Sequence, residues 1–516
     1  MSLWNFNISI KRILFFLLFG IYSYPGFSQE VQTLTLDKAI SIALDKSYDI
    51  KTLEKLVDQA EQNLIAARAQ YKTNVNFNLF APQYDEGYKL IERVEGNPVP
   101  KQQGSFQVRG VMDITQPMPW IPFGGGDLIL QGEAYQLNSW TPMINNPDEY
   151  TKSNRFFNKI SLIINKPLFT INDVALELRQ ARLNYRKQKR IFTRSELDLI
   201  YRITQQFFRL YRTIQEVNIN QEDVKRQQNI FATTKKKFQS GLIAEVDAMQ
   251  AEVDLIQARN SLKSSQGRME EQMASFKQLI GLPLDRKIDL TAELEVERID
   301  INIEKAISYA MENRSEIVEK EIDIENQEIN IQQTDARVSI KGSLRGYYQL
   351  SGFSEDELPW GTRTVDLIES SWEVLKQTPN RGVTFNLEVP LWDWGRNRAQ
   401  VRAAEVQLER DRMELENQYI TIEREVKDVI RSYYEAYDRV KMLEKSKEVS
   451  QRSFEINLER FENGDITSTE LARVSDQLNQ SLLSYLDAYN QYKLALADLR
   501  RKTLYDFETN TSLAEE

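Results

Sequence analysis

The chain has 516 residues, of which 28% are charged, and its formal net charge is −10. An acidic chain argues against nucleic-acid binding, which needs a basic patch. The sequence contains no Cys and no His, which excludes thiolate and imidazole metal sites, histidine general bases and histidine-based triads. Acidic pairs such as Glu270 and Glu271 lie on amphipathic helices, where they are ordinary solvated charges. We therefore predict no enzymatic activity, no cofactor and no bound metal.

Residues 1–28 have the pattern of a secretory signal peptide. Lys11-Arg12 form a positive flank, Ile13–Tyr22 form an apolar core, and Gly26-Phe27-Ser28 places small residues at the positions before cleavage. The alternative is an uncleaved membrane anchor, but about ten apolar residues are too few to span a bilayer. We expect cleavage after Ser28 and export across the inner membrane.

The mature chain begins with predicted helices over 35–70, and a helical segment over 303–337 repeats their pattern. Lys38-Ala39-Ile40-Ser41 matches Lys305-Ala306-Ile307-Ser308 at a shift of 267 residues (38 to 305). The repeat indicates an internally duplicated architecture, which takes precedence over a domain count from length.

The segments 72–168 and 338–392 change to a period of two, which indicates β-strands. Val383, Phe385 and Leu387, for example, alternate with polar residues. A soluble sheet is the ordinary explanation, but aromatic residues at strand ends are typical of outer-membrane strands. All tryptophans after the signal lie in or beside these segments: Trp120, Trp140, Trp360, Trp372, Trp392 and Trp394. We therefore predict membrane strands.

Each strand segment leads into a helix of unusual length, predicted over 172–240 and 396–463. Apolar residues spaced by three and four, such as Ile203, Phe207 and Leu210, lay a seam along one helix face. At 1.5 Å per residue each helix spans about 100 Å. The remaining predicted elements are the turns at Gly241 and Gly464 and the return helices over 242–280 and 466–507.

The matches divide the chain into a first repeat over 29–285, a charged linker over 286–300, a second repeat over 301–507 and a polar, flexible tail over 508–516. The shift is 267 residues before the strands but 223 after them (241 to 464), so the first repeat carries 44 extra residues (267 less 223). Alternating residues near 104–140, with three glycines at the centre, predict an inserted β-hairpin there. The sequence leaves open whether this hairpin joins a barrel or decorates it.

Two repeats in this order resemble the TolC family of outer-membrane efflux proteins. The resemblance rests on the strand exits Pro167-Leu168-Phe169 and Pro390-Leu391-Trp392, which both precede a tip glycine by 74 residues (167 to 241 and 390 to 464), and on the tip motif Phe238-x-x-Gly241. It covers essentially the whole mature chain. It implies a mainly α protein with transmembrane β structure. The expected assembly is a homotrimer whose 12-strand outer-membrane β-barrel continues into a long 12-helix periplasmic α-barrel. The family pattern has four strands per chain, from which the inserted hairpin departs.

The resemblance also implies a function. The chain would be a passive outer-membrane channel that reaches into the periplasm and forms the exit duct of a tripartite efflux pump or a type I secretion system. Its partners would be a periplasmic adaptor protein, an inner-membrane pump and outer-membrane lipid, with no nucleic acid. The transported substrate is normally chosen by the pump. The alternative is a non-pore periplasmic or surface coiled-coil structural protein, which would need neither the strands nor the tryptophans.

The resemblance places the working residues at the helical tips, where helix motion would gate the entrance. Glu470, Asp247 and Arg473 are the candidates for a pore constriction, although an acid such as Glu470 also favours a helix N-terminus for ordinary dipole reasons. The family's arginine lock falls at Ile466, with Phe461 beside it, so that lock is at most partial. The candidate adaptor-docking residues are those of the two tips: Phe238, Gly241, Leu242, Ile243, Ala244, Phe461, Gly464, Asp465 and Ile466.

Overall fold

The computed structural model describes residues 32–91, 97–122, 124–143, 148–292, 295–354, 362–375 and 379–513. The predicted signal peptide and Trp360 lie outside these ranges. The chain forms two compact units. The helical-hairpin unit takes the described residues up to Lys51, Glu196–Ala306 and those from Val426 onward, and the sheet unit takes Thr52–Ser195 and Ile307–Glu425.

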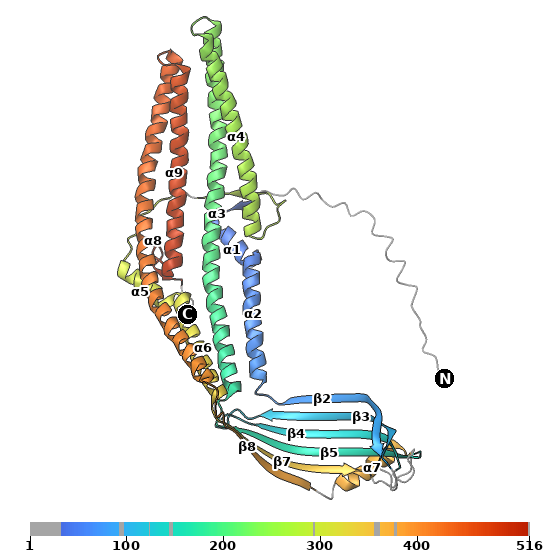
Figure 1. Ribbon diagram of the computed structural model, residues 1–516. Helices are drawn as coiled ribbons and strands as arrows, with labels where there is room; N and C mark the ends of the chain where they lie inside the picture. The colour runs from blue at the N-terminus through green and yellow to red at the C-terminus, as the bar shows by residue number, and fades with distance from the viewer. Residues whose placement is uncertain are drawn as a thin grey trace, which may run out of the picture. The chain divides into compact units, whose positions relative to one another are not determined.

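Two antiparallel helix pairs dominate the helical-hairpin unit (Figure 1). The first pair is the later part of α3 (Asp173–Gln239) with α4 (Glu245–Leu279), and the second is the later part of α8 (Arg396–Asn463) with α9 (Ser468–Thr503). The unit also contains α1 (Leu36–Lys46), the start of α2 (Tyr48–Ala69) and the first turn of α5 (Ile303–Asn313).

The helical-hairpin unit also contains two short strand pairs. β1 (Gln32–Leu34) pairs in parallel with β6 (Ile288–Leu290), inside the segment that the sequence predicts as a linker. β9 (Tyr505–Asp506) pairs with β10 (Thr511–Ser512), so part of the tail that was predicted to be flexible forms a hairpin.

The core of this unit is the apolar seam of the long helices. Ile203 and Phe207 of α3 and Tyr433 of α8 are fully buried, as the spacing of three and four predicts. Phe207 also contacts Phe276 of α4 edge to face, with ring centroids 6.1 Å apart. Burying a side chain of this size contributes about 1.5–3 kcal/mol, so tertiary packing rather than helix propensity stabilises these long helices.

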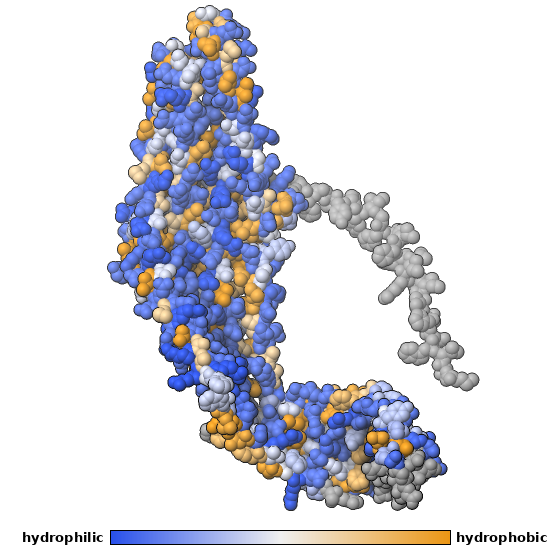
Figure 2. Space-filling model, viewed as in Figure 1, coloured by the Kyte–Doolittle hydropathy of each residue, from blue (hydrophilic) through white to orange (hydrophobic). Residues whose placement is uncertain are grey.

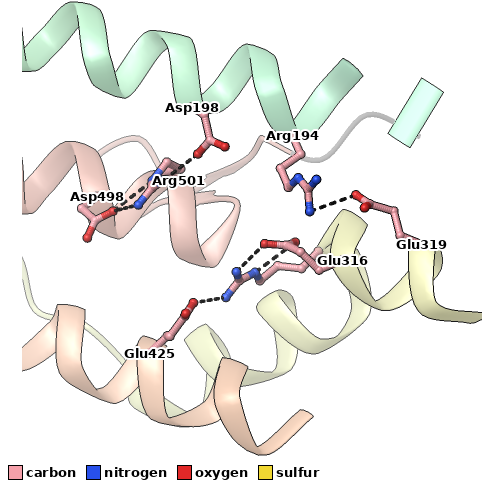
Figure 3. Close-up of polar contacts among 8 residues, drawn as sticks. Arg194, Asp198, Glu316, Glu319, Glu425, Asp498 and Arg501 are labelled. Atoms are coloured by element: carbon pink, nitrogen blue, oxygen red, sulfur yellow. Dashed lines mark hydrogen bonds and ion pairs between the residues drawn. The ribbon is translucent and has the colours of Figure 1, made fainter. Parts of the chain in front are cut away.

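Polar contacts fix the second helix pair to its surroundings within the same unit. Arg501 of α9 pairs with Asp198 of α3 at 2.5 Å and with Asp498 at 2.6 Å (Figure 3). The Tyr433 hydroxyl accepts a hydrogen bond from the backbone N–H of Ile299 at 2.8 Å. The chain between the two repeats is therefore bound to the helices through its backbone.

The sheet unit contains one antiparallel sheet of six strands in the order β2-β3-β4-β5-β7-β8. The resemblance implies four, and the two additional strands are β3 and β4, which lie between β2 and β5 in the region predicted to hold an inserted hairpin. The strands are β2 (Asn74–Ile91), β3 (Val99–Pro117), β4 (Asp127–Pro142), β5 (Tyr150–Leu168), β7 (Lys341–Phe353) and β8 (Pro379–Glu388).

A helix interrupts the segment 338–392, for which the sequence predicts strands alone. This helix, α7 (Thr364–Leu375), contacts β5 and β7. Its buried residues Leu367, Ser371 and Leu375 follow a spacing of four, a signal that was present in the sequence. Gly352 permits the close approach, because a Cβ there would lie 2.0 Å from the Ser371 carbonyl oxygen.

The helical part of the sheet unit is held by apolar and charged contacts. Leu183 of α3 packs with Ile322 and Ile329 of α6 (Ser315–Val338). Arg314, whose side chain is 9% exposed, binds Glu316 at 2.5 Å and Glu425 at 2.8 Å (Figure 3). Burial disfavours ionisation of Glu316, but the hydrogen bonds and charge of Arg314 outweigh it and lower the pKa of that carboxyl group.

Within the described ranges, every helix is too short or too polar to span a bilayer.

Candidate membrane sheet and helical tips

The two faces of the six-stranded sheet differ in chemistry. The register places Leu130 of β4 directly between Ile114 of β3 and Leu162 of β5, and alternate residues of all six strands continue this apolar face. Large hydrophobic side chains on it are exposed: Val75, Phe77, Leu79, Met112, Leu130, Leu162, Ile164, Leu344, Val383, Phe385 and Leu387. Monomeric soluble proteins rarely expose a continuous apolar patch of this extent.

The opposite face is mainly polar, and along β3, β4 and β5 its side chains are better buried than those of the apolar face. Glu133 of β4 is 8% exposed and forms ion pairs with Arg109 of β3, at 2.7 Å, and with Lys159 of β5. Ser161 on the same face is 2% exposed. The sheet is curved (Figure 1), and side chains on the inside of a curve crowd and cover one another. Polar inside and apolar outside is the inverse of a soluble protein and is typical of a membrane barrel wall.

A bulge in β2 keeps its apolar residues on the apolar face. The pairing with β3 shifts between Phe80 and Gln83, so Phe77 and Tyr84 have the same orientation although their numbers differ in parity. A slip of one residue would otherwise turn the second half of the strand over. The bulge therefore lets both halves of this 18-residue strand present their apolar residues on the same face.

Aromatic side chains lie at both ends of the sheet. At the end where the chain continues into α8, Trp392 and Trp394 are 76% and 89% exposed and their rings contact edge to face at 5.5 Å. Near the other end, Trp140 of β4 lies 5.8 Å from Tyr84 of β2. Exposed aromatic rings on either side of an apolar band are the arrangement of interfacial girdles.

The two helical tips share one turn geometry. Gly241 has φ +69° and Gly464 has φ +87°, a region that residues with a Cβ rarely adopt. In both tips the second residue of the turn donates its N–H to a carbonyl five residues earlier: Leu242 to Lys237 at 3.0 Å, and Asp465 to Arg460 at 2.9 Å. This is the Schellman ending of a helix, as the repeated Phe-x-x-Gly sequence indicates.

The neighbours of the two tips differ. Phe461 and Ile466 of the second tip are buried in an apolar cluster with Ile230 of α3 and with Phe454, Leu471 and Leu478. At the first tip Leu242 is 73% exposed and Phe238 is 37% exposed, Ile243 is half-buried and Ala244 is exposed. Hydrophobic colour gathers at the end of the first helix pair in the surface view (Figure 2).

The predicted gating residues lie in the first two turns of the two return helices. Glu470 and Arg473 of α9 are exposed, and Asp247 of α4 is half-buried. The backbone N–H of Glu470 is capped by the Thr467 hydroxyl at 3.2 Å. Over the described part of this chain the three side chains form no ion pair. Ile466, at the position of the family's arginine, faces the apolar cluster.

An exposed apolar stripe on α4 was missed from the sequence. Val246, Met249, Val253 and Ile256 follow a spacing of three and four and are 45–68% exposed. This spacing is the seam of a coiled coil and could have been found from the sequence. The equivalent positions of α9, 223 residues later, are mostly polar: Thr469, Ala472, Asp476 and Asn479. The stripe therefore belongs to the first repeat alone.

A curved sheet with an apolar outer face and aromatic ends, continued by helices of 67 and 68 residues, defines the class of outer-membrane ducts. The family profile described as outer membrane efflux protein matches residues 146–282 and 306–503. The chain therefore belongs to the outer membrane efflux protein family. No curated protein shows significant sequence similarity to it.

Solved structures of three outer-membrane proteins share the fold. The CmeC outer membrane channel of Campylobacter jejuni superposes with a TM-score of 0.65 at 14% identity, over 93% of this chain and 87% of that one. VceC of Vibrio cholerae gives 0.61 at 13% identity, over 91% and 95%. The open state of the MtrE channel of Neisseria gonorrhoeae gives 0.62 at 14% identity, over 91% and 88%.

Proposed function

We propose that the chain forms the outer-membrane exit duct of a tripartite efflux pump or a type I secretion system. The observation that carries the proposal is the exposed apolar face of a sheet whose opposite face is mainly polar and, along β3, β4 and β5, partly buried. A single copy leaves both sheet edges unpaired, which lipid does not permit, so several copies must close the wall. Membership of the family, together with outer-membrane channels of the same fold, supports a homotrimer that continues into a helical barrel in the periplasm.

The helical tips carry the proposed partner contacts. The first tip, with its exposed Leu242, would receive the periplasmic adaptor of the inner-membrane pump, because an exposed apolar tip is stabilised by a partner. The α4 stripe from Val246 to Ile256 would pack against a helix of the next copy, since its spacing is that of a helix seam. The buried cluster around Ile466 would keep the second tip in one conformation while the first tip binds the adaptor.

Gating is proposed to depend on the carboxylates near the tip turns. Three copies would bring three Glu470 and three Asp247 side chains around one axis, and rings of like charge repel one another and favour cations. Adaptor binding would favour the open arrangement through its higher affinity for that state. No catalytic step belongs to this proposal.

Planar-bilayer recording of the detergent-extracted protein tests the duct. Discrete, stable, cation-preferring conductance steps are expected. A matched pair of charge insertions tests the sheet: Phe385→Arg places a charge on the apolar face, and Asn386→Arg places it on the polar face one residue away. The first should cost about 2–4 kcal/mol and reduce the amount recovered in the outer membrane, and the second should not. Equal recovery of both variants, or a wild type that stays soluble, would overturn the proposal.

Conductance also tests the tips. Glu470→Ala combined with Asp247→Ala should weaken cation preference, whereas Glu462→Ala, an exposed acid of the same tip, should not. Val246→Asp should prevent assembly of the complete duct, and Thr469→Asp, at the equivalent position of the other repeat, serves as its control. Unchanged ion selectivity in the double variant would exclude the acidic constriction.

A further inference from the structure

The sheet has two free edges within the part of the chain that the structure describes. β2 and β8 are the ends of the strand order, and each pairs with one neighbour only. All neighbouring pairs are antiparallel and the strands number six, so β2 and β8 run in opposite directions. A β8 edge of one copy can therefore pair with the β2 edge of the next copy and keep the whole wall antiparallel.

The inserted hairpin runs the full height of this wall. At one end of the sheet Pro117 of β3 pairs with Asp127 of β4, and towards the other end Gly104 pairs with Trp140. β3 also pairs with β2 as far as the Ile91–Val99 pair, and β4 pairs with β5 as far as the Pro142–Tyr150 pair. The hairpin is thus a continuous part of the sheet between β2 and β5.

The turn of the inserted hairpin is bonded to the exit of β5. Lys166 donates through its Nζ to the carbonyl oxygen of Gly125 at 2.7 Å, and the Asn172 side-chain amide donates to the carbonyl oxygen of Pro119 at 2.7 Å. Lys166 directly precedes the exit motif Pro167-Leu168-Phe169, whereas the turn belongs to the insertion. These bonds join the turn of the added strands to the end of β5 and the start of α3.

The hairpin also continues both chemical faces of the sheet. Met112 and Leu130 extend the exposed apolar face. On the polar face the ion pairs of Glu133 join β3, β4 and β5 through Arg109 and Lys159. A hairpin packed outside or above a barrel would have no reason to carry the same alternation in the same register.

We propose that all six strands of each copy enter the barrel, so that three copies build an 18-strand wall where the family pattern has 12. The proposal rests on the trimer of the proposed function and adds the strand count. The matched family profile begins at residue 146, which leaves β2, β3 and β4 before the matched range. The strand count is therefore argued from the pairings of this chain itself.

Barrel geometry gives the size of the effect. With strands about 4.8 Å apart and tilted about 40°, a 12-strand ring has a backbone diameter of about 24 Å and an 18-strand ring about 36 Å. The cross-section rises by a little more than twofold. Outer-membrane barrels of 16–18 strands leave an aqueous channel. The outer-membrane end of this duct would then admit hydrated cargo well above the size of a drug molecule, lined by the mixed charges of Arg109, Glu133 and Lys159.

Disulfide mapping in the membrane tests the strand order, and the chain, which has no cysteine of its own, needs no prior substitution. Phe77 of β2 lies directly opposite Met112 of β3, and that row continues to Gly132 and Ile160 of β5. Directly opposite residues lie within the Cα separation that a disulfide spans. If the hairpin is in the wall, Phe77 and Ile160 are three strand spacings or about 14 Å apart.

Phe77→Cys with Met112→Cys should therefore cross-link, and Phe77→Cys with Ile160→Cys should give only background yield. The opposite result would mean that the hairpin leaves the wall and that β2 pairs with β5, which overturns the proposal. Electron-microscopic images of the extracted oligomer along its axis give a second readout: a strand ring of about 36 Å supports 18 strands, and one of about 24 Å refutes them. Membrane fractionation of the same samples distinguishes failure of the 18-strand wall from failure of the proposed duct. A soluble protein would refute the duct itself, whatever the strand order.

Discussion

Removing one hydroxyl group from Tyr433 tests how the segment between the repeats is held. This side chain is fully buried, and its hydroxyl accepts from the Ile299 N–H at 2.8 Å and donates to the Glu297 carbonyl oxygen at 3.2 Å. Tyr492 donates to the same Glu297 oxygen at 2.8 Å. Burial raises the pKa of Tyr433, against the opposing effect of the Ile299 bond, so the hydroxyl keeps its proton at ordinary pH.

We expect the two Tyr→Phe substitutions to lower the free energy of unfolding by different amounts. Tyr433→Phe leaves the Ile299 N–H buried without a partner, which costs about 1–3 kcal/mol. Tyr492→Phe leaves the Glu297 oxygen still bonded to Tyr433, so only a net hydrogen bond of about 0.5–1.5 kcal/mol is lost. Hydrogen exchange at the Ile299 amide should accelerate roughly 5- to 150-fold in the first variant, and roughly 2- to 10-fold in the second.

The double variant sharpens this comparison. Once both hydroxyls are gone the Glu297 oxygen also loses its last tyrosine, so the combined loss should exceed the sum of the two single losses. Exchange at the amide of Ile203, elsewhere in the same core, should respond much less than at Ile299. If Tyr492→Phe proved as costly as Tyr433→Phe, the argument from an unpaired buried donor would be refuted.

Three further predictions concern an ion pair, a carboxyl group and a turn glycine. Arg314→Met should destabilise the sheet unit by about 2 kcal/mol, below the roughly 3–5 kcal/mol of a fully buried pair because its carboxylate partners keep some solvent contact. Since the pKa of Glu316 is lowered, wild type should lose this stability as the pH falls below about 4.3, and the variant should show no such loss in acid unfolding. Burial and then the charge of Asp223 raise the pKa of Asp476. The folded state is therefore most stable with this carboxyl group protonated, and it loses stability as the pH rises above about 3.9. Asp476→Asn should raise the melting temperature at pH 7 but not at pH 3.5. Gly464→Ala should cost about 1–2 kcal/mol through its positive φ, whereas Gly267→Ala in the middle of α4 should stabilise, and similar melting temperatures for these two would contradict the turn geometry.

The long helices could be predicted closely because their signals are local. A run without glycine or proline, an apolar seam and a terminal glycine act within one helix and need no knowledge of the rest of the fold. The predicted segment 396–463 coincides with α8, and 172–240 exceeds α3 by one residue at each end. The exposed apolar face of the strands follows equally from alternation along each strand.

Strand order and the helix between β7 and β8 could not be predicted in the same way. Alternation shows that a segment is a strand but does not show which strand lies beside it, and the position of β3 and β4 inside the sheet depends on pairing with β2 and β5. Helix α7 can pack on the sheet because Gly352 has no side chain that would clash with it. The side-chain amide of Asn158 also donates a hydrogen bond to the Ser371 hydroxyl at 3.2 Å. The second of these contacts joins residues 213 positions apart, so it is not visible in the local sequence of the helix.

The two tips show why a repeat in sequence does not predict a repeat in surface. Phe238 and Phe461 occupy equivalent positions, yet the first is 37% exposed and the second 4% exposed. The difference lies in the neighbours, because the second tip packs on Ile230 of α3 and the first finds no such cluster in the described residues of this chain. The same turn motif therefore ends one helix inside an apolar cluster and the other with exposed apolar residues. This asymmetry, rather than either tip motif, is the reason why adaptor docking is proposed at the first tip.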